Sequence, residues 1–234
     1  MMTIANHEGV STASLGLPAT SAIPEAKSHL PAQAFITKPP ASSRLRQHFT
    51  TKVDSITMLS LLRPATTGLA DGIRCHEVLV MAIGLKSEDV PVDVLDRIAS
   101  LRSSGIIFVC IHPSEGRTAC TMALRRALPT RPGHQQEYAT HLGRTQTIDE
   151  ARLKVSGSTM DDLWDSLCAQ VILGTMDGGD LDQRIAKRER ITALLNEESK
   201  LAGDHGRAKS TQDRNAIYAK LHKVRAELEE LQSE

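Results

Sequence analysis

The feature that most constrains this chain is a pair of apolar segments separated by an amphipathic one, between Ile73 and Ile111. Val78–Leu85 and Ile106–Ile111 are almost continuously apolar and rich in β-branched residues, which is typical of strands buried on both faces. Between them, Pro91 suits the first turn of a helix, where its missing N–H costs nothing. Gly105 can end that helix with a positive φ. The pattern predicts a strand, a helix and a second strand, and a right-handed crossover if the strands are parallel.

Two further strands are predicted on either side of this unit. Val53–Leu62 alternates, which predicts one face with Ile56, Met58 and Leu62 and a second face with Val53, Leu59 and Leu61. Arg117–Leu124 also alternates and is predicted to pair antiparallel with Ile106–Ile111 through a turn at His112–Gly116. Pro129–Gly143 is predicted to be a loop, and Arg144–Asp149 a short strand. These elements predict an α/β fold: a small mixed sheet with a βαβ core and flanking helices.

Helices are indicated by caps followed by apolar residues at helical spacing. Ser42 or Ser43 is positioned to cap one helix, and Ser158 or Thr159 another. In the second of these helices Trp164 falls on the apolar face, so we interpret it as a core residue rather than a ligand-stacking one.

The C-terminal part of the chain has a different composition. An amphipathic helix is predicted from Leu181 to Leu201, followed by a hinge at Gly203–Gly206. A heptad seam then steps by four and three residues, which is typical of a coiled coil. Either the two helices fold back as a hairpin, or they pair with another chain. The seam residues are the predicted interaction residues: Ile217, Leu221, Val224, Leu228 and Leu231.

The predicted organisation therefore has three parts. Residues 1–26 are small, polar and aperiodic and are predicted to be largely disordered. Residues 27–175 form the α/β domain, and residues 180–234 form the C-terminal helical, coiled-coil region.

Charge and cysteine usage narrow the function classes. The 28 basic and 28 acidic residues balance, so no global charge attracts nucleic acid or an anionic membrane. The four cysteines are widely spaced without a CxxC pair, and we interpret them as buried free thiols in a reducing compartment. No apolar stretch is long enough for a membrane span. We expect a cytoplasmic protein that makes no membrane contact.

Two local segments are basic although the whole chain is neutral. One lies between Lys27 and Lys52, and the other between Gly116 and Gln136. They could contact phosphate groups, but solvated arms and edge-protecting arginines are the readings we favour. The candidate nucleic-acid-binding residues are Lys38, Arg44, Arg46, Arg117, Arg125 and Arg126.

No sequence motif indicates a particular catalytic reaction. One enzymatic hypothesis, a metal-dependent nuclease, can be compared with the sequence residue by residue. Metal-dependent nucleases of the PD-(D/E)xK type hold Mg²⁺ with carboxylates and place a lysine on the same strand. Lys86 ends a strand here, but the residue two before it is Gly84, which cannot bind a metal. Glu77 and Asp71, or Asp54, would have to supply the carboxylates. We therefore expect no metal or other cofactor, with Mg²⁺ only if this alternative holds.

Several stretches together resemble the bacterial and archaeal family known as domain of unknown function number 4391. They are FITKPP, VDSITMLSLLRPATTGL, EVLVMAIGLK, VLDRIASLRSSGIIFVC and DRNAIYAKLHKVRAELEELQ. The resemblance implies an α/β domain with a C-terminal helical tail. It also implies a genetic setting beside helicases and DNA methyltransferases of restriction-type defence systems, and it brings no catalytic residues. The family often carries an acid at the position of Gly84, so this chain departs from the pattern there.

These observations lead to one preferred hypothesis and two alternatives. We expect a non-enzymatic accessory subunit of a DNA-processing system of the restriction or phage-defence type. It would assemble through its C-terminal helices with a partner such as a helicase or DNA methyltransferase, or with itself. The alternatives are a divergent or degenerate metal-dependent nuclease and a DNA-binding module.

Overall fold

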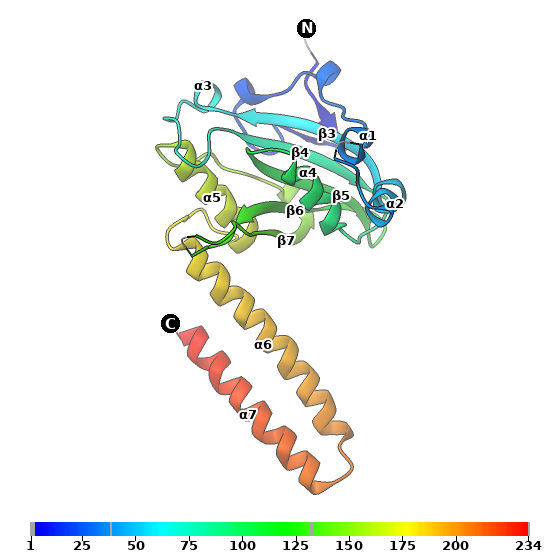
Figure 1. Ribbon diagram of the computed structural model, residues 1–234, viewed down its shortest axis with the longest axis vertical. Helices are drawn as coiled ribbons and strands as arrows, with labels where there is room; N and C mark the ends of the chain where they lie inside the picture. Colours follow the sequence, from blue (N-terminus) through cyan, green and yellow to red (C-terminus); the bar gives the residue numbers. More distant parts are fainter. Residues whose placement is uncertain (1–2, 38, 132, 234) are drawn as a thin grey trace. The chain divides into compact units, whose positions relative to one another are not determined.

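The computed structural model describes residues 3–37, 39–131 and 133–233. The chain divides into two compact units, Met1–Gly179 and Asp180–Glu234. The first is a mixed α/β unit and the second consists of long helices, as Figure 1 shows. The predicted fold class is confirmed.

The first unit is built on one five-stranded mixed sheet in the order β3-β4-β5-β6-β7 (Figure 1). Only the β4–β5 pair is parallel, and the other three pairs are antiparallel. The strands are β3 Val53–Leu62, β4 Val78–Leu85, β5 Gly105–Ser114, β6 Arg117–Ala127 and β7 Tyr138–Thr147.

The predicted strand, helix and strand form the centre of this sheet. Every residue of β4 is buried, and α4 (Val92–Ser100) begins after Pro91. The parallel register pairs Val78 with Gly105 and Gly84 with Ile111. Continuous apolar sequence in β4 and β5 is explained by their central position, where both faces are covered.

The β5–β6 connection is tighter than predicted. Strand β5 continues to Ser114, inside the expected turn, and only Glu115 and Gly116 remain before β6, with φ of 47° and 76°. Two successive positive φ values are typical of the hairpin turn that matches strand twist. The prediction for β7 was wrong at its start. The strand begins at Tyr138, inside the segment predicted to be a loop, because β6 extends to Ala127 and offers it a pairing partner.

The prediction of which β3 side chains share a face was wrong for three residues, Val53, Leu61 and Leu62. Irregularities lie between Val53 and Ser55 and between Met58 and Ser60. Each extra residue shifts the alternation by one position. As a result Val53 and Leu61 join Ile56 and Met58 on the face that packs against the main core.

The N-terminal segment is folded, so the prediction of disorder for residues 1–26 was wrong where the structure describes it. It contains β1 (Asn6–His7) and β2 (Val10–Ser11), the short helix η1 (Ala19–Ser21), and the start of η2 (Glu25–Lys27). Three of its apolar side chains are fully buried, Ala5, Val10 and Leu15, whereas Ile4 is 49% exposed.

The same segment completes the outer edge of β3. The N–H groups of Ile23 and Leu30 donate to the carbonyls of Leu59 and Ile56, at 3.0 and 2.9 Å. The N–H of Met58 donates to the carbonyl of Ser28 at 2.8 Å. A sheet edge paired in this way no longer offers free backbone groups to another chain.

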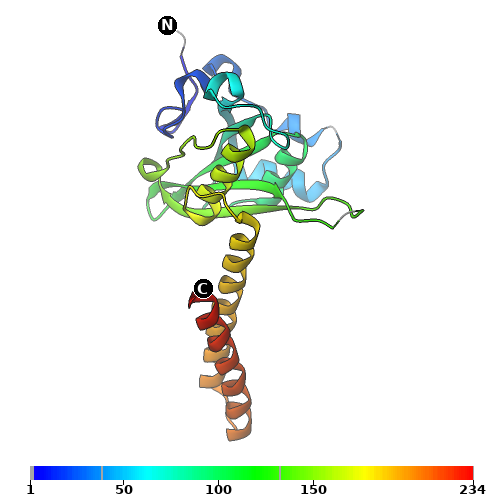
Figure 2. The same ribbon diagram turned by 90° about the vertical axis from the view of Figure 1, so that its left-hand side faces the viewer.

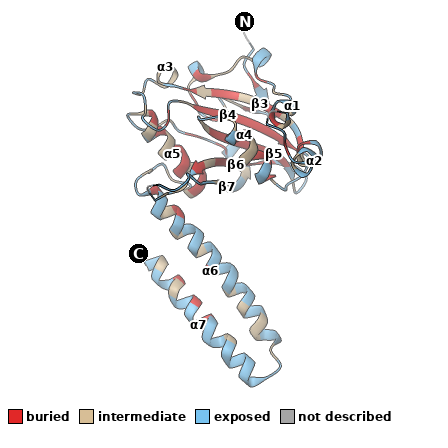
Figure 3. Cartoon of the chain, in the orientation of Figure 1, coloured by how far each residue is buried: buried red, intermediate tan, exposed pale blue. Residues whose placement is uncertain are grey.

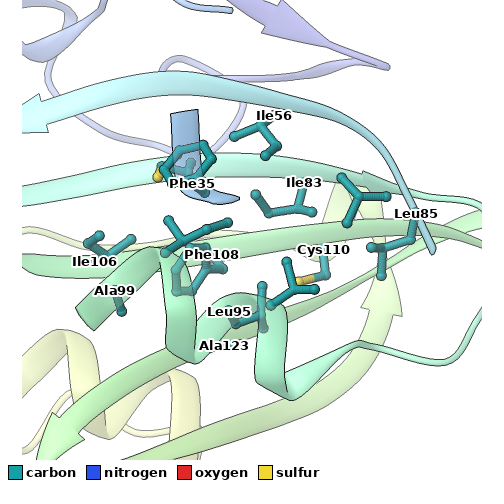
Figure 4. Packing of buried hydrophobic residues seen from close by; sticks show 14 of the residues in the cluster. Phe35, Ile56, Ile83, Leu85, Leu95, Ala99, Ile106, Phe108, Cys110 and Ala123 are labelled. Atoms are coloured by element: carbon teal, nitrogen blue, oxygen red, sulfur yellow. The ribbon is translucent and has the colours of Figure 1, made fainter. Parts of the chain in front are cut away.

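The main apolar core lies on the α4 face of the sheet. Leu95 and Ile98 of α4 pack with Phe108 of β5, and Figure 4 shows these layers close together. Helices α1 (Gln33–Ile36) and α2 (Ser43–Lys52) close this core with stacked rings of Phe35 and Phe49, whose centroids are 6.2 Å apart. The hydroxyl of Ser42 caps α2 by accepting from the Leu45 N–H, as predicted.

The remaining helices of the first unit are short except for α5 (Met160–Leu173). The hydroxyl of Thr159 caps α5 by accepting from the Asp162 N–H, as predicted. Trp164 is half-buried against Gly105, which is consistent with its predicted packing role. The other short elements are α3 (Pro64–Thr67) and η3 (Ile148–Glu150).

The second unit is an antiparallel hairpin of α6 (Leu181–Arg207) and α7 (Thr211–Ser233). The hinge predicted at Gly203–Gly206 was wrong, because both glycines lie inside α6 and the turn follows at residues 208–210. Leu194, Val224 and Leu228 form a small apolar core between the two helices. Most of the remaining hairpin surface is exposed, as the burial colours of Figure 3 show.

Candidate functional site

The residues considered for a nuclease site lie at opposite ends of the central strand. Glu77 precedes β4 and Lys86 follows it, nine residues later. At about 3.3 Å per residue, this separation is about 30 Å. Asp54 lies at the Lys86 end, because Val53 pairs with Leu85, whereas Asp71 is on the loop that leads to Glu77. The structure therefore does not bring the two carboxylates of that loop and the lysine together.

At the Lys86 end, the position of the missing carboxylate is occupied by other groups. A Cβ added to Gly84 would lie 2.5 Å from Ser55 Oγ and 2.8 Å from His7 Nε2. Lys86 Nζ donates to the carbonyl of Thr50 at 2.8 Å. The space for an acidic side chain at residue 84 is thus filled by the N-terminal segment and β3, and the lysine is tied to the end of α2.

Two histidines from the N-terminal segment hydrogen bond to β3. His7 Nε2 lies 3.1 Å from Ser55 Oγ, and His29 Nδ1 lies 3.3 Å from Thr57 Oγ1. Burial lowers the pKa of His7, although the neighbouring Glu8 and Asp54 carboxylates act to raise it. A neutral imidazole beside a hydroxyl is chemically able to accept its proton. The sequence did not reveal this pair, because His7 falls in the segment predicted to be disordered.

At the other end of β4, Glu77 is held between two arginines. Its Oε2 accepts from Arg63 Nη2 and Nε at 2.7 and 2.8 Å, and its Oε1 accepts from Arg102 Nη2 at 3.0 Å. Burial acts to raise the pKa of Glu77, but the hydrogen bonds from Arg63 and Arg102 outweigh it and lower the pKa. Since both oxygens are engaged, this carboxylate serves to join the β3 end, β4 and the segment after α4.

The loop before β4 is anchored by Asp161 of α5. Its carboxylate accepts from the backbone N–H groups of Ile73, Arg74 and Cys75, at 2.9, 3.0 and 2.8 Å. Burial acts to raise the pKa of Asp161, but these three hydrogen bonds outweigh it and lower the pKa. Sequence reasoning assigned Asp161 only to the first turn of a helix, and nothing local in the sequence indicates that it also holds a loop 87 residues away.

On the same loop Asp71 and His76 form an exposed pair, with Oδ1 and Nδ1 3.0 Å apart. Their hydrogen bond raises the pKa of His76 and lowers the pKa of Asp71. Among residues 3–37, 39–131 and 133–233, no three His, Cys, Asp or Glu side chains form a group that could hold a metal ion.

The candidate phosphate-binding arginines are dispersed. Arg117 is exposed beside the β5–β6 turn, whereas Arg125 is eight residues further along β6, about 26 Å away. Arg125 pairs with Asp96 at 2.6 Å, and its guanidinium carbon lies 4.0 Å from the ring centre of Tyr138. Arg126 is buried.

The other candidate arginines, Arg44 and Arg46, are exposed on α2, and Lys38 lies outside the described residues. A groove of about 360 Å³ runs between α2 and α4 beside Arg44. It also contains Asp93 and Asp96, whose negative charges oppose phosphate binding. The charged side chains around Asp96 thus include both signs, with Arg44 and Arg125 among the basic ones.

All four cysteines are buried free thiols, as predicted: Cys75, Cys110, Cys120 and Cys168. Burial raises the pKa of Cys120 to about 11, and it raises the pKa of Cys110 and Cys168 further. Thiolate formation is therefore disfavoured at these positions, and a nucleophilic role is not supported by their surroundings.

The predicted interaction residues of the heptad seam face α6 of the same chain. Leu221, Val224 and Leu228 are buried, and Ile217 and Leu231 are half-buried. The hairpin is further joined by ion pairs of Arg190 with Glu227 at 2.6 Å and of Arg225 with Glu198 at 2.7 Å. The hairpin alternative is therefore the one that the structure adopts.

The hairpin also carries a groove of about 420 Å³. One wall is Leu195 of α6, which is 47% exposed, and the deepest apolar residue is Leu228 of α7. Polar and charged side chains complete the lining: Glu198, Arg225, Glu229, Gln232 and Ser233. An apolar patch bordered by charges is typical of a surface that contacts another protein.

Within the described part of the chain, none of the helices combines the length and apolar character needed to cross a bilayer. Neither the search of curated proteins nor the search of solved structures found a match. A family model described as Domain of unknown function (DUF4391) matches residues 15–228, nearly the whole folded chain. The chain therefore belongs to the DUF4391 family.

Proposed function

We propose that this protein is a non-enzymatic accessory subunit that assembles with a partner protein through the α6–α7 hairpin. The observation that carries the proposal is that Asp180–Glu234 is a compact unit in its own right, with a separate apolar core. These 55 residues form a helical hairpin with an apolar core of its own and a long exposed surface. An exposed helical surface of this kind is well suited to contact with a partner protein.

The arrangement of the sheet unit supports a non-enzymatic role. Glu77 is engaged by two arginines, Lys86 is engaged by a backbone carbonyl, and the two residues are about 30 Å apart. The space at Gly84 is filled by His7 and Ser55. These contacts give Glu77 and Lys86 structural roles in the sheet unit.

For the setting, we propose a DNA-processing system of the restriction or phage-defence type, as the family resemblance implies. The partner would be an enzyme of that system, such as a helicase or a DNA methyltransferase. The balanced charge of the hairpin, with eleven basic and eleven acidic residues, suits a protein partner better than a polyanion.

The test is co-expression of the tagged chain with the helicase or methyltransferase encoded beside its gene. The full chain is expected to retain the enzyme through affinity and size-exclusion steps. A chain ending at Gly179 is expected to lose it while keeping the native fluorescence of Trp164, which reports that the sheet unit is folded. Equal retention by both chains would refute the assembly role of the hairpin.

A further inference from the structure

Two large apolar side chains are exposed among the described residues of the hairpin, and they lie on one side of it. Leu195 is 47% exposed and Tyr218 is 57% exposed, and both are large enough to contribute to a contact. Leu195 borders the 420 Å³ groove, whose α7 wall includes Arg225 and Glu229. Tyr218 precedes these two residues by seven and eleven positions, which places all three on the same helical face. We call this surface the Leu195 side.

Contacts between the helices show which residues lie at the same height along the hairpin. Arg190 pairs with Glu227, and Glu198 pairs with Arg225. By this correspondence Tyr218 lies level with about residue 202 of α6. It is therefore about seven residues, or roughly 10 Å, closer to the turn than Leu195 is. The ring of His205 contacts Tyr218, with centroids 6.2 Å apart, which agrees with this level.

The charges of the hairpin are separated along its length although they balance overall. The turn half, residues 200–220, has five basic and two acidic residues and a net charge of +3. The remainder of residues 180–234 has six basic and nine acidic residues and a net charge of −3. Both acids of the turn half are engaged locally, Asp204 with Arg207 and Asp213 with Ser210. Such a charge distribution attracts a second hairpin that lies antiparallel and repels one that lies parallel.

We propose that the Leu195 side binds the same side of a second copy of this chain, with the two hairpins antiparallel. This inference goes beyond the proposed function, because it assigns the Leu195 side to a second copy and leaves the rest of the hairpin surface to the partner enzyme. A single twofold axis perpendicular to the hairpins, close to the level of residue 198, brings Leu195 of each copy level with Tyr218 of the other. The same axis places Arg214, one turn before Tyr218, against Glu229 of the second copy. The apolar pair and the charged pair therefore give the same register independently.

The packing that results is an antiparallel four-helix arrangement. Two hairpins that bury Leu195 and Tyr218 would extend the small core of Leu194, Val224 and Leu228. Four-helix bundles are stable with such cores, whereas a lone two-helix hairpin buries little apolar surface. A second copy therefore stabilises the hairpin as well as covering its exposed apolar side chains.

The first experiment measures the oligomeric state of the full chain by sedimentation velocity across concentration. The wild type is expected to be a dimer, and Leu195→Glu and Tyr218→Glu are expected to weaken dimerisation at least tenfold. Ala193→Glu and Ala216→Glu add the same charge at exposed positions on the opposite side and are the matched controls. Circular dichroism at 222 nm shows whether each variant keeps its helices. A chain that stays monomeric up to about 100 μM, or controls that weaken dimerisation equally, would overturn the proposal.

Two further measurements test the register. Arg214→Glu is expected to weaken the dimer, and adding Glu229→Arg in the same chain is expected to restore it. A spin label on Lys209→Cys, near the turn, is expected to give a distance between copies of about 30 Å, since each label lies about ten residues from the axis. A distance of about 10 Å would mean parallel hairpins and would refute the register. If the chain is monomeric but the hairpin still retains a different enzyme, the assembly function stands and this inference fails.

Discussion

Removal of the Asp161 carboxylate is expected to destabilise the sheet unit by about 3 kcal/mol. The carboxylate accepts three backbone N–H groups of the loop before β4, and its side chain is only 17% exposed. In Asp161→Ala the N–H groups of Ile73 and Arg74 are exposed and regain water, so each loses about 0.5 kcal/mol. The N–H of Cys75 belongs to a buried residue and is left without an acceptor, which costs about 1–3 kcal/mol.

The measurement is urea unfolding followed by the fluorescence of Trp164, the single tryptophan, which lies in the sheet unit three residues from Asp161. Asp161→Asn keeps one acceptor oxygen and is expected to lose about half as much stability as Asp161→Ala. Asp149→Ala, at an exposed position, is the control and is expected to change stability by less than about 0.5 kcal/mol. A loss below about 1 kcal/mol in Asp161→Ala would show that the carboxylate does not hold the loop.

The stability difference between the wild type and Asp161→Ala is also expected to depend on pH. Because the folded-state pKa of Asp161 is lowered, its stabilisation is fully present above the ordinary aspartate pKa of about 4. That stabilisation is lost as the pH falls through the folded-state pKa. The stability difference between wild type and Asp161→Ala should therefore be constant from pH 7 to 5 and shrink at lower pH, and a difference that grows on acidification would contradict the assignment.

Four other outcomes follow from the structure. Gly105→Ala places a Cβ 2.7 Å from the Trp164 ring and should cost about 1–3 kcal/mol in urea unfolding followed by circular dichroism. Combination with Trp164→Leu should recover part of this loss by the same measurement, and additive losses would exclude the clash. Val224→Ala should lower the midpoint of thermal unfolding measured by circular dichroism at 222 nm, without changing the midpoint measured by Trp164 fluorescence. An equal shift of both midpoints would show that the two units unfold together. Native protein at pH 8 should resist thiol reagents at Cys120 and the other cysteines until it unfolds, whereas rapid labelling would mean an accessible thiolate. Purified protein with Mg²⁺ or Mn²⁺ should not cleave DNA, and cleavage that Lys86→Ala abolishes would revive the nuclease alternative.

The central part of the fold was predictable because its signals are local. Continuous apolar sequence in β4 and β5, Pro91 before α4 and the hydroxyl caps of α2 and α5 each act within a few residues. The folded N-terminal segment was not predictable in this way. Its polar composition resembles disorder, and its order comes from backbone pairing with β3, which only the tertiary structure supplies.

The candidate site was less predictable than the fold. Glu77 and Lys86 are close in sequence, but an extended strand of eight residues separates them by its own length. The contacts that occupy the strand ends come from distant segments, such as His7 against Gly84 and Asp161 against the loop before β4. In the hairpin, the heptad pattern correctly marked the apolar seam, but a periodic pattern does not say whether the second helix comes from the same chain.

Hydrogen–deuterium exchange on the free and the assembled chain tests directly whether the α6–α7 hairpin is the assembly surface. Assembly is expected to slow exchange in α6 and α7, most strongly around Leu195 and Tyr218, and to leave the amides of β3 to β7 unchanged. Slower exchange confined to the sheet unit, with the hairpin unaffected, would contradict the assignment of the hairpin as the assembly surface.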